Sequence, residues 1–390
     1  MIFLLELFLA TYFLYITSYV VFFSLGGFLY QRLTLSMKTR NRNYLILIPG
    51  YKEDEVIFEA VKKNLSIEFD KSSYHVLVIA DSFQPSTLDQ LAKLDCEVLE
   101  VQFEESTKVK SLQRAVSHIS GQYDQVIILD ADNIMEKDYL MKVDSFLDEK
   151  GSKAIQTQRV PKNQNNRLAI LDGISEAINN HIYRQGASAT GFSAALNGSG
   201  MVFDLSLFTS IILKMNSVGG FDRELEYQLL EKGVKVKYLK EACIYDEKTD
   251  DHKNFQNQRK RWISSQYVYL FKYFGSGLKR LLFKGDLVYF HSTVWRNIQL
   301  PRLINLGLFT ICILVLFPFK DSLVIPFAFW FTLWASYISA TLICVPGKYL
   351  NGKLFFTLLL LPKILVTMLQ LMFNLKGANK RFIHTSHKAK

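Results

Sequence analysis

Short aliphatic runs alternate with amphipathic stretches between residues 43 and 265, and this alternation limits the possible folds more than any other feature of the chain. The aliphatic runs expected to form strands are 44–48, 76–80, 97–101 and 126–129. The intervening stretches expected to form helices are 53–67, 85–94 and 108–119. Strands separated by helices are typical of βαβ units with a mostly parallel sheet. The sequence therefore predicts an α/β domain.

Polar segments follow three of the expected strands. Pro49-Gly-Tyr51 follows the first, Asp81-Ser82 the second, and Asp130-Ala-Asp132 the last. Ligands of α/β sheets bind outside the carboxyl ends of the strands. We therefore expect these three segments to meet at one edge of the sheet and to form a binding site.

Three further stretches carry no charged residue, namely 7–30, 303–319 and 322–347. The first is long enough to span a bilayer core, and the other two, separated only by Lys320-Asp321, indicate a membrane hairpin. A signal peptide is the alternative for the first stretch, but no basic region precedes it. Composition thus predicts an N-terminal transmembrane helix within 1–30 and a C-terminal membrane region within 300–375.

The basic segments on either side of the membrane stretches predict the topology. Arg32–Arg42 and the tail 376–390 are rich in Lys and Arg and contain no acid, so the positive-inside rule places both in the cytoplasm. An even number of crossings must then lie between them, which leaves 354–375, broken at Pro362-Lys363, as a re-entrant or interfacial segment. We expect a multi-pass protein of the inner (plasma) membrane with a cytoplasmic soluble domain.

The net charge of +10 and the aromatic content of 14% suit contact with lipid head groups or phosphates. Nucleic acid is disfavoured as a partner because the basic excess flanks apolar segments. Residues 266–299 combine aromatic and basic residues, which favours amphipathic helices on the membrane surface over an ordinary surface helix pair. The four cysteines form no Cys-x-x-Cys pair, and the sequence has no Walker loop and no His-Glu metalloprotease motif.

Six short motifs occur in one order along the chain: Ile48–Asp54, Val78–Ser82, Lys108–Ala115, Asp130-Ala-Asp132, Leu196–Met201 and Gln258-Arg-Lys-Arg261-Trp262. In this order the chain resembles the membrane-bound family 2 glycosyltransferases, the inverting group that includes cellulose, chitin and hyaluronan synthases. The resemblance covers most of 43–265. It implies a Rossmann-like domain of the GT-A kind with a mixed sheet, and transmembrane helices at both ends.

The resemblance also implies an activity. The enzyme would transfer a sugar with inversion from a nucleoside diphosphate sugar, expected to be a UDP-sugar, to a growing polysaccharide or a lipid-linked acceptor, with an export partner protein as a possible associate. A non-processive enzyme that glycosylates one lipid is the nearest alternative. A catalytically inactive membrane scaffold of the same fold is another, and the small number of membrane stretches disfavours a transporter.

Roles for individual residues follow from the same resemblance. Donor binding is expected from Pro49, Tyr51, Glu53, Asp81, Lys110 and Asp130, and acceptor or diphosphate contacts from Gly198, Gly200, Gln258, Arg261 and Trp262. Asp130 and Asp132 offer hard oxygen ligands for Mg²⁺ or Mn²⁺, although they could instead cap a following helix. Tyr51 could stack on the base or anchor its loop, and Trp262 could underlie an acceptor sugar or, with Arg261, anchor the domain to lipid.

The catalytic base is the one position that departs from the family pattern. The family usually has a Glu-Asp pair, and here Asp222 occupies the second place while Phe221 replaces the first acid. A carboxylate must take the proton of the acceptor hydroxyl as it attacks. Asp222 is the expected base and Glu224 the alternative, although Asp222 could also cap the following helix.

Overall fold

The aliphatic runs form the first four strands of an eight-stranded sheet in the computed structural model, which describes residues 2–34, 42–249, 251–350 and 357–375. The strands are β1 (Tyr44–Tyr51), β2 (Tyr74–Asp81), β3 (Glu97–Val101), β4 (Gln125–Ile128), β5 (Ile134–Met135), β6 (Ala154–Pro161), β7 (Met201–Asp204) and β8 (Lys237–Asp246). Their spatial order is β3-β2-β1-β4-β7-β6-β8-β5. The first four are parallel, whereas β7 runs antiparallel to both β4 and β6, and β5 runs antiparallel to β8. The sheet is therefore mixed, as expected.

The register of the parallel strands brings the polar segments together. Tyr51 at the end of β1 lies beside Asp81 at the end of β2, and β4, which ends just before Asp130, pairs with the other side of β1. Parallel strands place their carboxyl ends at one edge, so the loops that follow them converge. The predicted meeting of these segments at one edge is confirmed.

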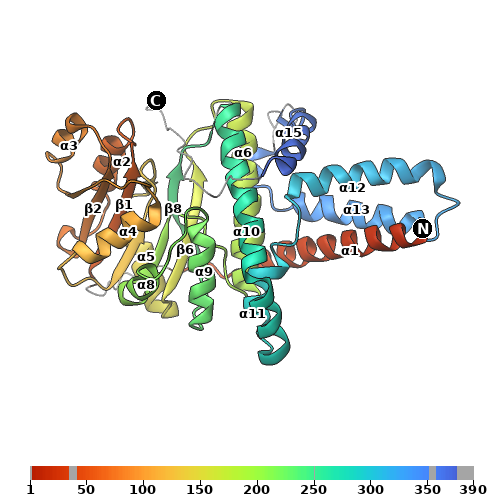
Figure 1. The fold of residues 1–390 in the computed structure, drawn as a ribbon, viewed down its shortest axis with the longest axis horizontal. Helices are drawn as coiled ribbons and strands as arrows, with labels where there is room; N and C mark the ends of the chain where they lie inside the picture. Colours follow the sequence, from red (N-terminus) through yellow and green to blue (C-terminus); the bar gives the residue numbers. More distant parts are fainter. Residues whose placement is uncertain (1, 35–41, 250, 351–356, 376–390) are drawn as a thin grey trace.

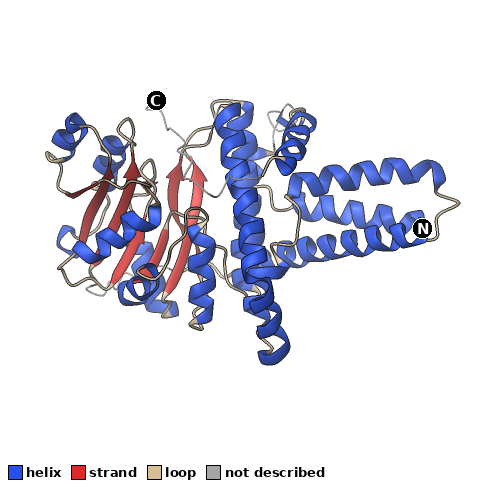
Figure 2. Cartoon of the chain, in the orientation of Figure 1, coloured by secondary structure: helices blue, strands red, loops and turns tan. Residues whose placement is uncertain are grey.

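Helices cover both faces of the sheet (Figure 2) because successive strand side chains point to opposite faces. One face packs against α4 (Lys108–His118), α8 (Leu205–Ile212) and α9 (Phe221–Glu231), and the other against α2 (Ile57–Asn64), α3 (Pro85–Leu91) and α5 (Tyr139–Lys150). The first helix was expected from residue 53 but begins at Ile57, because 52–56 form a turn that leaves the end of β1.

Two long helices stand between the sheet and a projecting arm of three helices (Figure 1). The first, α6 (Arg167–Asn179), continues into a π-helical segment, η3 (Asn180–Gly186), and the short α7 (Ala187–Ala189). The second, α10 (His252–Lys284), packs against α6 and runs without a break across the boundary expected between 265 and 266. Then α11 (Leu287–Phe290) and the π-helical η4 (His291–Trp295) lead toward the arm.

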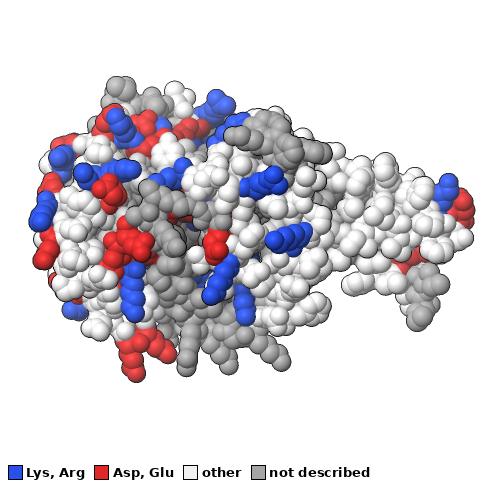
Figure 3. Space-filling view, turned by 90° about the horizontal axis from the view of Figure 1, so that it is seen from above, with Lys and Arg blue, Asp and Glu red and all other residues white. Residues whose placement is uncertain are grey.

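Three helices form an arm that projects from the α/β part (Figure 1): α1 (Ile2–Gly26), α12 (Arg302–Leu316) and α13 (Phe327–Leu342). Large apolar side chains such as Phe8, Leu314 and Phe331 are exposed on it, and Figure 3 shows the arm almost free of charge while the α/β part is densely charged. Within the described residues, helical stretches 3–29 and 302–319 are long and apolar enough to cross a membrane, and 327–342 and 361–373 are shorter.

The last helix, α15 (Leu361–Phe373), lies at the base of the arm beside α10 and α12 (Figure 1). A Cβ on Gly307 would lie 2.3 Å from a methyl group of Leu365, so the Leu365 side chain packs directly against the α12 backbone at this glycine. The basic linker at 35–41, residues 351–356 and the basic tail 376–390 fall outside the described residues, so the expected topology stays a prediction.

Candidate functional site

A cavity of about 680 Å³ lies between the carboxyl ends of the strands and the layer formed by α6 and α10, and it continues to residues of α12, α13 and α15. Most of the residues expected at a site line it: Pro49, Tyr51, Glu53, Asp81, Asp130, Asp132, Gly198, Asp222, Gln258, Arg261 and Trp262. Segments separated by more than 200 residues thus contribute to one cavity. The expected residues that do not line it are Lys110, Gly200 and Glu224.

The backbone turns sharply where β1 and β2 reach the cavity. Lys52 and Ser82 have φ of 54° and 58°, the left-handed region that disfavours residues with a side chain. The Lys52 N–H donates to the Asp81 carbonyl at 3.1 Å, which ties the two turns together. Such conformations cost about 1–3 kcal/mol each and cluster at functional sites, so the surrounding structure holds the rim of the cavity in place.

Asp81 presents an unsatisfied carboxylate oxygen at the end of β2. The residue is 1% exposed, and its Oδ1 accepts from the Ser82 hydroxyl at 3.0 Å. Its Oδ2 is buried and has no hydrogen-bond partner among the described residues. A buried oxygen without a donor is costly, so a ligand N–H or hydroxyl group would complete this position.

The Asp-x-Asp segment is held by a network beneath it. Asp132 is 4% exposed, and its Oδ1 accepts from the side-chain amide of Asn133 at 3.0 Å. The Asp130 N–H donates to the Ser199 hydroxyl at 2.9 Å. The short strand β5 follows this segment, and the N-cap of the next helix is Asp138. The alternative that Asp130 and Asp132 cap a helix is therefore wrong.

These carboxylates suit a divalent cation only in part. Within the described residues, no group of three or more His, Cys, Asp or Glu side chains could by itself hold a metal. Mg²⁺ and Mn²⁺ prefer oxygen ligands, and Mg²⁺ is commonly bound by one or two carboxylates together with substrate phosphates. Asp132 and Asp130 could supply such carboxylates, and a substrate phosphate and water would have to complete the coordination.

Lys108 occupies the place that was expected of Lys110. The Lys108 ammonium forms an ion pair with Asp130 and donates to the Gly198 carbonyl at 2.7 Å. Lys110 instead donates to the Glu105 carbonyl at 2.7 Å, outside the cavity. The reason is the start of α4: its N-cap Thr107 accepts from the Lys110 N–H, so Lys108 is the first helical residue and points to the strand ends.

The glycine turn after α7 serves two purposes. Gly198 has φ of +89°, lines the cavity and offers its carbonyl to Lys108. Gly200 does not line the cavity; its φ is +60°, and a Cβ there would lie 2.5 Å from the Thr157 hydroxyl. Gly200 therefore shapes the turn beneath Asp130, which corrects its expected ligand role.

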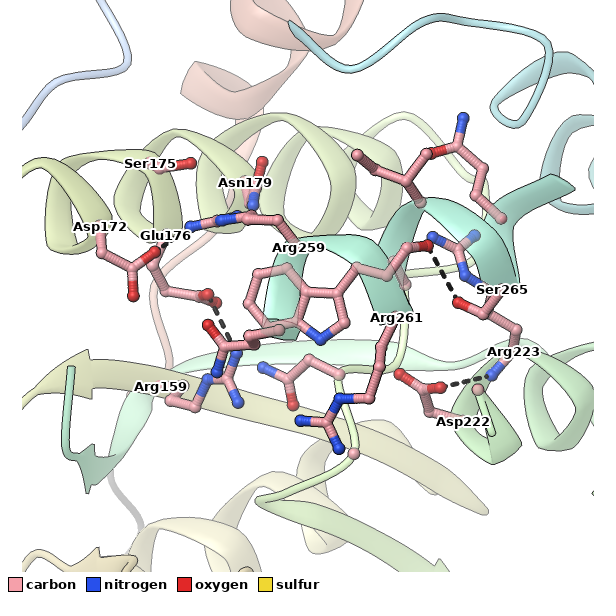
Figure 4. Close-up of a pocket in the computed structure, with 18 of the residues that line it drawn as sticks. Arg159, Asp172, Ser175, Glu176, Asn179, Asp222, Arg223, Arg259, Arg261 and Ser265 are labelled. Carbon is pink, nitrogen blue, oxygen red and sulfur yellow. Dashed lines mark hydrogen bonds and ion pairs between the residues drawn. The ribbon is translucent and has the colours of Figure 1, made fainter. Parts of the chain in front are cut away.

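Asp222 lies in the first turn of α9, facing the cavity (Figure 4). The N-cap of α9 is Gly220, with φ of +67°, so the capping alternative for Asp222 is wrong. The Asp222 Oδ1 accepts from the N–H of Arg223 at 3.0 Å. Its carboxylate is half-buried in the cavity wall, where it can reach a bound hydroxyl group.

Glu224 lies on a different face of α9 from Asp222, away from the cavity, and its carboxylate is hydrogen-bonded to other side chains. It accepts from Ser217 Oγ at 2.6 Å, from the Tyr269 hydroxyl at 3.1 Å and from Lys272 Nζ at 2.8 Å. Burial raises the pKa of Glu224, but the hydrogen bonds from Lys272 and Ser217 outweigh it and hold the pKa below its usual value. A carboxylate that already accepts three hydrogen bonds and lies outside the cavity is a poor general base. The geometry therefore disfavours Glu224 as the catalytic base.

The Gln-x-x-Arg-Trp residues Gln258, Arg261 and Trp262 lie on α10 and line the cavity. Arg261 extends toward the strand ends, where burial lowers the pKa of its guanidinium and the charge of Asp130 opposes that effect. The Arg259 guanidinium lies between two rings, 4.8 Å from the centroid of Phe255 and 4.5 Å from that of Trp262. One face of Trp262 is therefore covered, and only the other face could underlie a sugar.

Four arginines contact one polar stripe of α6, and sequence reasoning missed all of them. Arg259 forms an ion pair with Asp172, and both Arg159 and Arg184 contact Glu176 at 3.1 Å (Figure 4). The fourth is Arg302. The signal in the sequence is the stripe itself, since Asp172, Ser175, Glu176 and Asn179 follow helical i, i+3, i+4, i+7 spacing within an apolar helix.

The chain is similar to several known proteins. It is 25% identical over 267 residues, 64% of this chain and 61% of the relative, to "Probable glycosyltransferase YdaM" of Bacillus subtilis (strain 168), so it spans less than two thirds of that relative. Mannosyltransferase PcManGT from Pyrobaculum calidifontis, solved with GDP-Man and Mn²⁺, has 13% identity and a TM-score of 0.53 over 85% of this chain and 96% of that chain. S. aureus TarS 1-349 with UDP-GlcNAc has 14% identity and a TM-score of 0.41, covering 76% and 92%.

A family model settles the classification. The model described as "Glycosyltransferase like family 2" matches residues 41–265, more than half of the chain. The matched region contains the mixed sheet, the Asp-x-Asp segment and the first part of α10, and it ends within the helix that carries Trp262. The chain therefore belongs to the glycosyltransferase-like family 2 and has its GT-A-like fold.

Proposed function

We propose that this chain is a membrane-bound inverting glycosyltransferase that transfers a sugar from a nucleoside diphosphate sugar to an acceptor entering from the membrane side. The observation that carries the proposal is the single cavity that joins the polar strand ends to apolar residues of α12, α13 and α15. A donor bound at the strand ends and an acceptor held near the membrane would meet at Asp222.

The donor end has the charges that a sugar diphosphate needs. Asp132 and Asp130 would hold Mg²⁺ or Mn²⁺, which stabilises the negative charge that develops on the leaving diphosphate. Lys108 and Arg261 add positive charge beside them. The relative PcManGT was solved with GDP-Man and Mn²⁺, which supports this donor class and metal type. We propose a UDP-sugar because Asp81 can accept from the uracil N–H or the ribose, with a GDP-sugar as the alternative.

Asp222 would act as the general base. As the acceptor hydroxyl oxygen bonds to the anomeric carbon, the carboxylate takes its proton, and the bond to the diphosphate breaks with its electron pair leaving on the diphosphate. Attack from the face opposite the leaving group inverts the anomeric centre. The scaffold alternative rests on Phe221 in place of an acid, but Asp222, Lys108 and Asp132 all line the same cavity, which favours an enzyme.

The arm would anchor the enzyme in the plasma membrane with its α/β domain in the cytoplasm. Three helices, α1, α12 and α13, would cross, and α15 beside α10 would lie at the interface, in agreement with basic residues at Arg32–Arg42 and in the tail. A single cysteine placed in the tail at 376–390 tests this arrangement in intact cells. Labelling by a membrane-impermeant reagent would contradict it, whereas labelling only after permeabilisation supports it.

The acceptor could be a growing polysaccharide or a lipid, and the cavity favours the lipid. Its far end is lined by Leu306, Leu342, Val345, Leu361, Ile364 and Met368. Apolar walls stabilise hydrocarbon chains and offer little to a hydrated polymer. A single transfer to a lipid-linked acceptor is therefore our second, narrower proposal. An export partner for a polymer stays an expectation from the family resemblance.

The deciding experiment uses the purified full-length protein in phosphatidylcholine nanodiscs. Labelled UDP- and GDP-sugars are added with Mn²⁺ and a membrane lipid extract, and the products are identified by mass. A lipid with one added sugar supports single transfer, and a ladder of masses supports a polymer. Donor left intact in every mixture, by protein that retains its fold, would support the scaffold instead.

A further inference from the structure

Four arginines from other elements contact α6, and we term them the arginine layer (Arg159, Arg184, Arg259 and Arg302). They carry more positive charge than the acidic residues paired with them neutralise. Glu176 contacts both Arg159 and Arg184, and Asp172 contacts Arg259. Asp246 lies a further 3.7 Å from Arg159 but also binds Lys248 at 2.6 Å. All four arginines line the cavity, so their guanidinium groups lie at its wall between the strand ends and the apolar end.

Arg302 has the least neutralised charge in this layer. It is the first residue of α12 and donates to Asn179 Oδ1 at 3.0 Å and to the carbonyl and hydroxyl oxygens of Ser175 at 3.2 and 3.1 Å. These partners, the ones that the described residues provide, are neutral. A guanidinium has five N–H donors, so contacts to two residues leave donors for a ligand. Arg302 is half-buried at the start of α12, and an anion would stabilise a cation that is partly removed from water.

Arg259 is held rigidly in reach of the same space. Its guanidinium lies between the Phe255 and Trp262 rings and contacts Asp172, while its buried Nε has no hydrogen-bond partner among the described residues. Fixed planar guanidinium groups bind phosphate through paired N–H donors. Residues 259 and 302 thus bring two donors from α10 and α12 to one side of α6.

The space beyond the arginine layer is apolar. Leu306, Leu342, Val345, Leu361, Ile364 and Met368 line the end of the cavity toward the arm. Charge on one side and hydrocarbon on the other match an amphiphile with an anionic head, because neither a free phosphate nor a neutral lipid satisfies both. Along the cavity, the donor end would therefore be followed by Asp222, then by the arginine layer, and finally by the apolar wall.

We infer that the acceptor is a phosphate-bearing lipid whose phosphate binds Arg259 and Arg302, whose chains contact α12, α13 and α15, and whose terminal hydroxyl reaches Asp222. The phosphate is recognised and does not react. The hydroxyl oxygen forms the bond to the anomeric carbon, the carbon–diphosphate bond breaks, and Asp222 receives the proton. The inference rests on the proposed function for its turnover step, but lipid binding is measurable without it.

Binding is tested on the full-length protein by native mass spectrometry in a maltoside detergent with three matched probes. Phosphatidylglycerol has the chains, the phosphate and a terminal hydroxyl, diacylglycerol lacks the phosphate, and glycerol phosphate lacks the chains. We expect phosphatidylglycerol to bind at least about tenfold more tightly than either, because charge-assisted bonds to phosphate are among the strong ones. Equal retention of diacylglycerol, or equal affinity for glycerol phosphate, would overturn the inference.

Variants locate the binding at the arginine layer. Arg302→Gln should weaken phosphatidylglycerol binding about tenfold, and Arg302→Lys should weaken it less because the charge remains. Lys279→Gln, which removes an exposed charge of α10 outside the cavity, is the control and should bind like wild type. Unchanged binding by folded Arg302→Gln contradicts the proposal. If that variant does not fold, the lysine variant and the three probes on wild type still decide.

Turnover separates failure of this inference from failure of the proposed function. Arginine-dependent lipid binding without consumption of any sugar nucleotide would leave the lipid site standing and reject the enzyme. Transfer of sugar to diacylglycerol and phosphatidylglycerol at equal rates would keep the enzyme and reject the phosphate site. Transfer only to the phosphate-bearing lipid supports both.

Discussion

The two ends of the cavity are built in opposite ways. At the donor end, carboxylates lie in loops that directly follow neighbouring parallel strands, so the sheet register fixes their positions. Toward the apolar end, arginines from β6, η3, α10 and α12 meet at α6 through packing between elements. The first arrangement places acids for a metal and a nucleotide, and the second places cations beside apolar walls.

This contrast separates chemistry from recognition. Changes at the strand ends and at Asp222 should affect the rate of sugar transfer, whereas changes in the arginine layer should affect which acceptor binds. Interactions made only in the transition state change the rate without changing ground-state binding. Variants at the strand ends should therefore change the transfer rate, and variants in the arginine layer should change acceptor binding. Each of the following experiments can contradict this separation.

The largest effect is expected from Asp222→Asn, where the two ends meet. Loss of the general base should lower the transfer rate by about 10²–10⁴-fold, because the amide cannot take the proton of the acceptor. Donor binding should stay near the wild-type value, measured by isothermal titration with the nucleoside diphosphate. The product assay by mass reports the rate. An active Asp222→Asn enzyme would show that the general base is another residue and that Asp222 does not contact the acceptor hydroxyl in the reaction.

Asp132→Asn should follow, with a rate lowered about 10²–10³-fold through lost charge stabilisation. The fold should persist, since Asn is nearly isosteric and can keep the contact with Asn133. A titration of Mn²⁺ should shift to higher concentrations in the variant. Full wild-type activity in the presence of EDTA would contradict metal use at this end of the cavity.

A matched lysine pair gives a smaller effect. Lys108→Gln should lower transfer about tenfold or more, because the ammonium that joins Asp130 to the Gly198 carbonyl is lost. Lys110→Gln should change the rate less than twofold, since that side chain bonds outside the cavity. Both variants lose one charge from the same turn of α4. Equal effects of the two substitutions on the transfer rate would contradict the conclusion that Lys108, and not Lys110, contributes to the donor site.

The donor end could be predicted from the sequence because each segment directly follows a strand, and a strand's end fixes the place of the next few residues. Asp81, Asp130 and Asp132 are examples. The choice between Lys108 and Lys110 failed because it depends on where the N-cap falls, a single residue. Arg259 and Arg302 could not be placed, because their partners on α6 lie 87 and 127 residues away in the chain and are reached through packing that no local pattern encodes.

Glu224→Gln probes the side of α9 that belongs to neither end. Its carboxylate accepts three hydrogen bonds from Ser217, Tyr269 and Lys272. Loss of the charge should lower stability by about 1–2 kcal/mol, seen as a melting temperature a few degrees lower, while transfer activity remains. This pattern is the reverse of that for Asp222→Asn. Loss of transfer with an unchanged melting temperature would instead place Glu224 in the chemistry.

The same variant predicts a pH dependence of stability. The pKa of Glu224 in the folded protein lies below its ordinary value of 4.5, since hydrogen bonds from Lys272 and Ser217 outweigh the effect of burial. A group whose pKa falls on folding stabilises the protein above its unfolded pKa and loses that contribution as the pH drops through the folded value. The difference in melting temperature between wild type and Glu224→Gln should therefore be constant from neutral pH down to about 5 and shrink below about 4. A difference in melting temperature that grows as the pH falls would mean that Glu224 is protonated in the folded protein. That result would contradict the ionised carboxylate that accepts hydrogen bonds from Ser217, Tyr269 and Lys272.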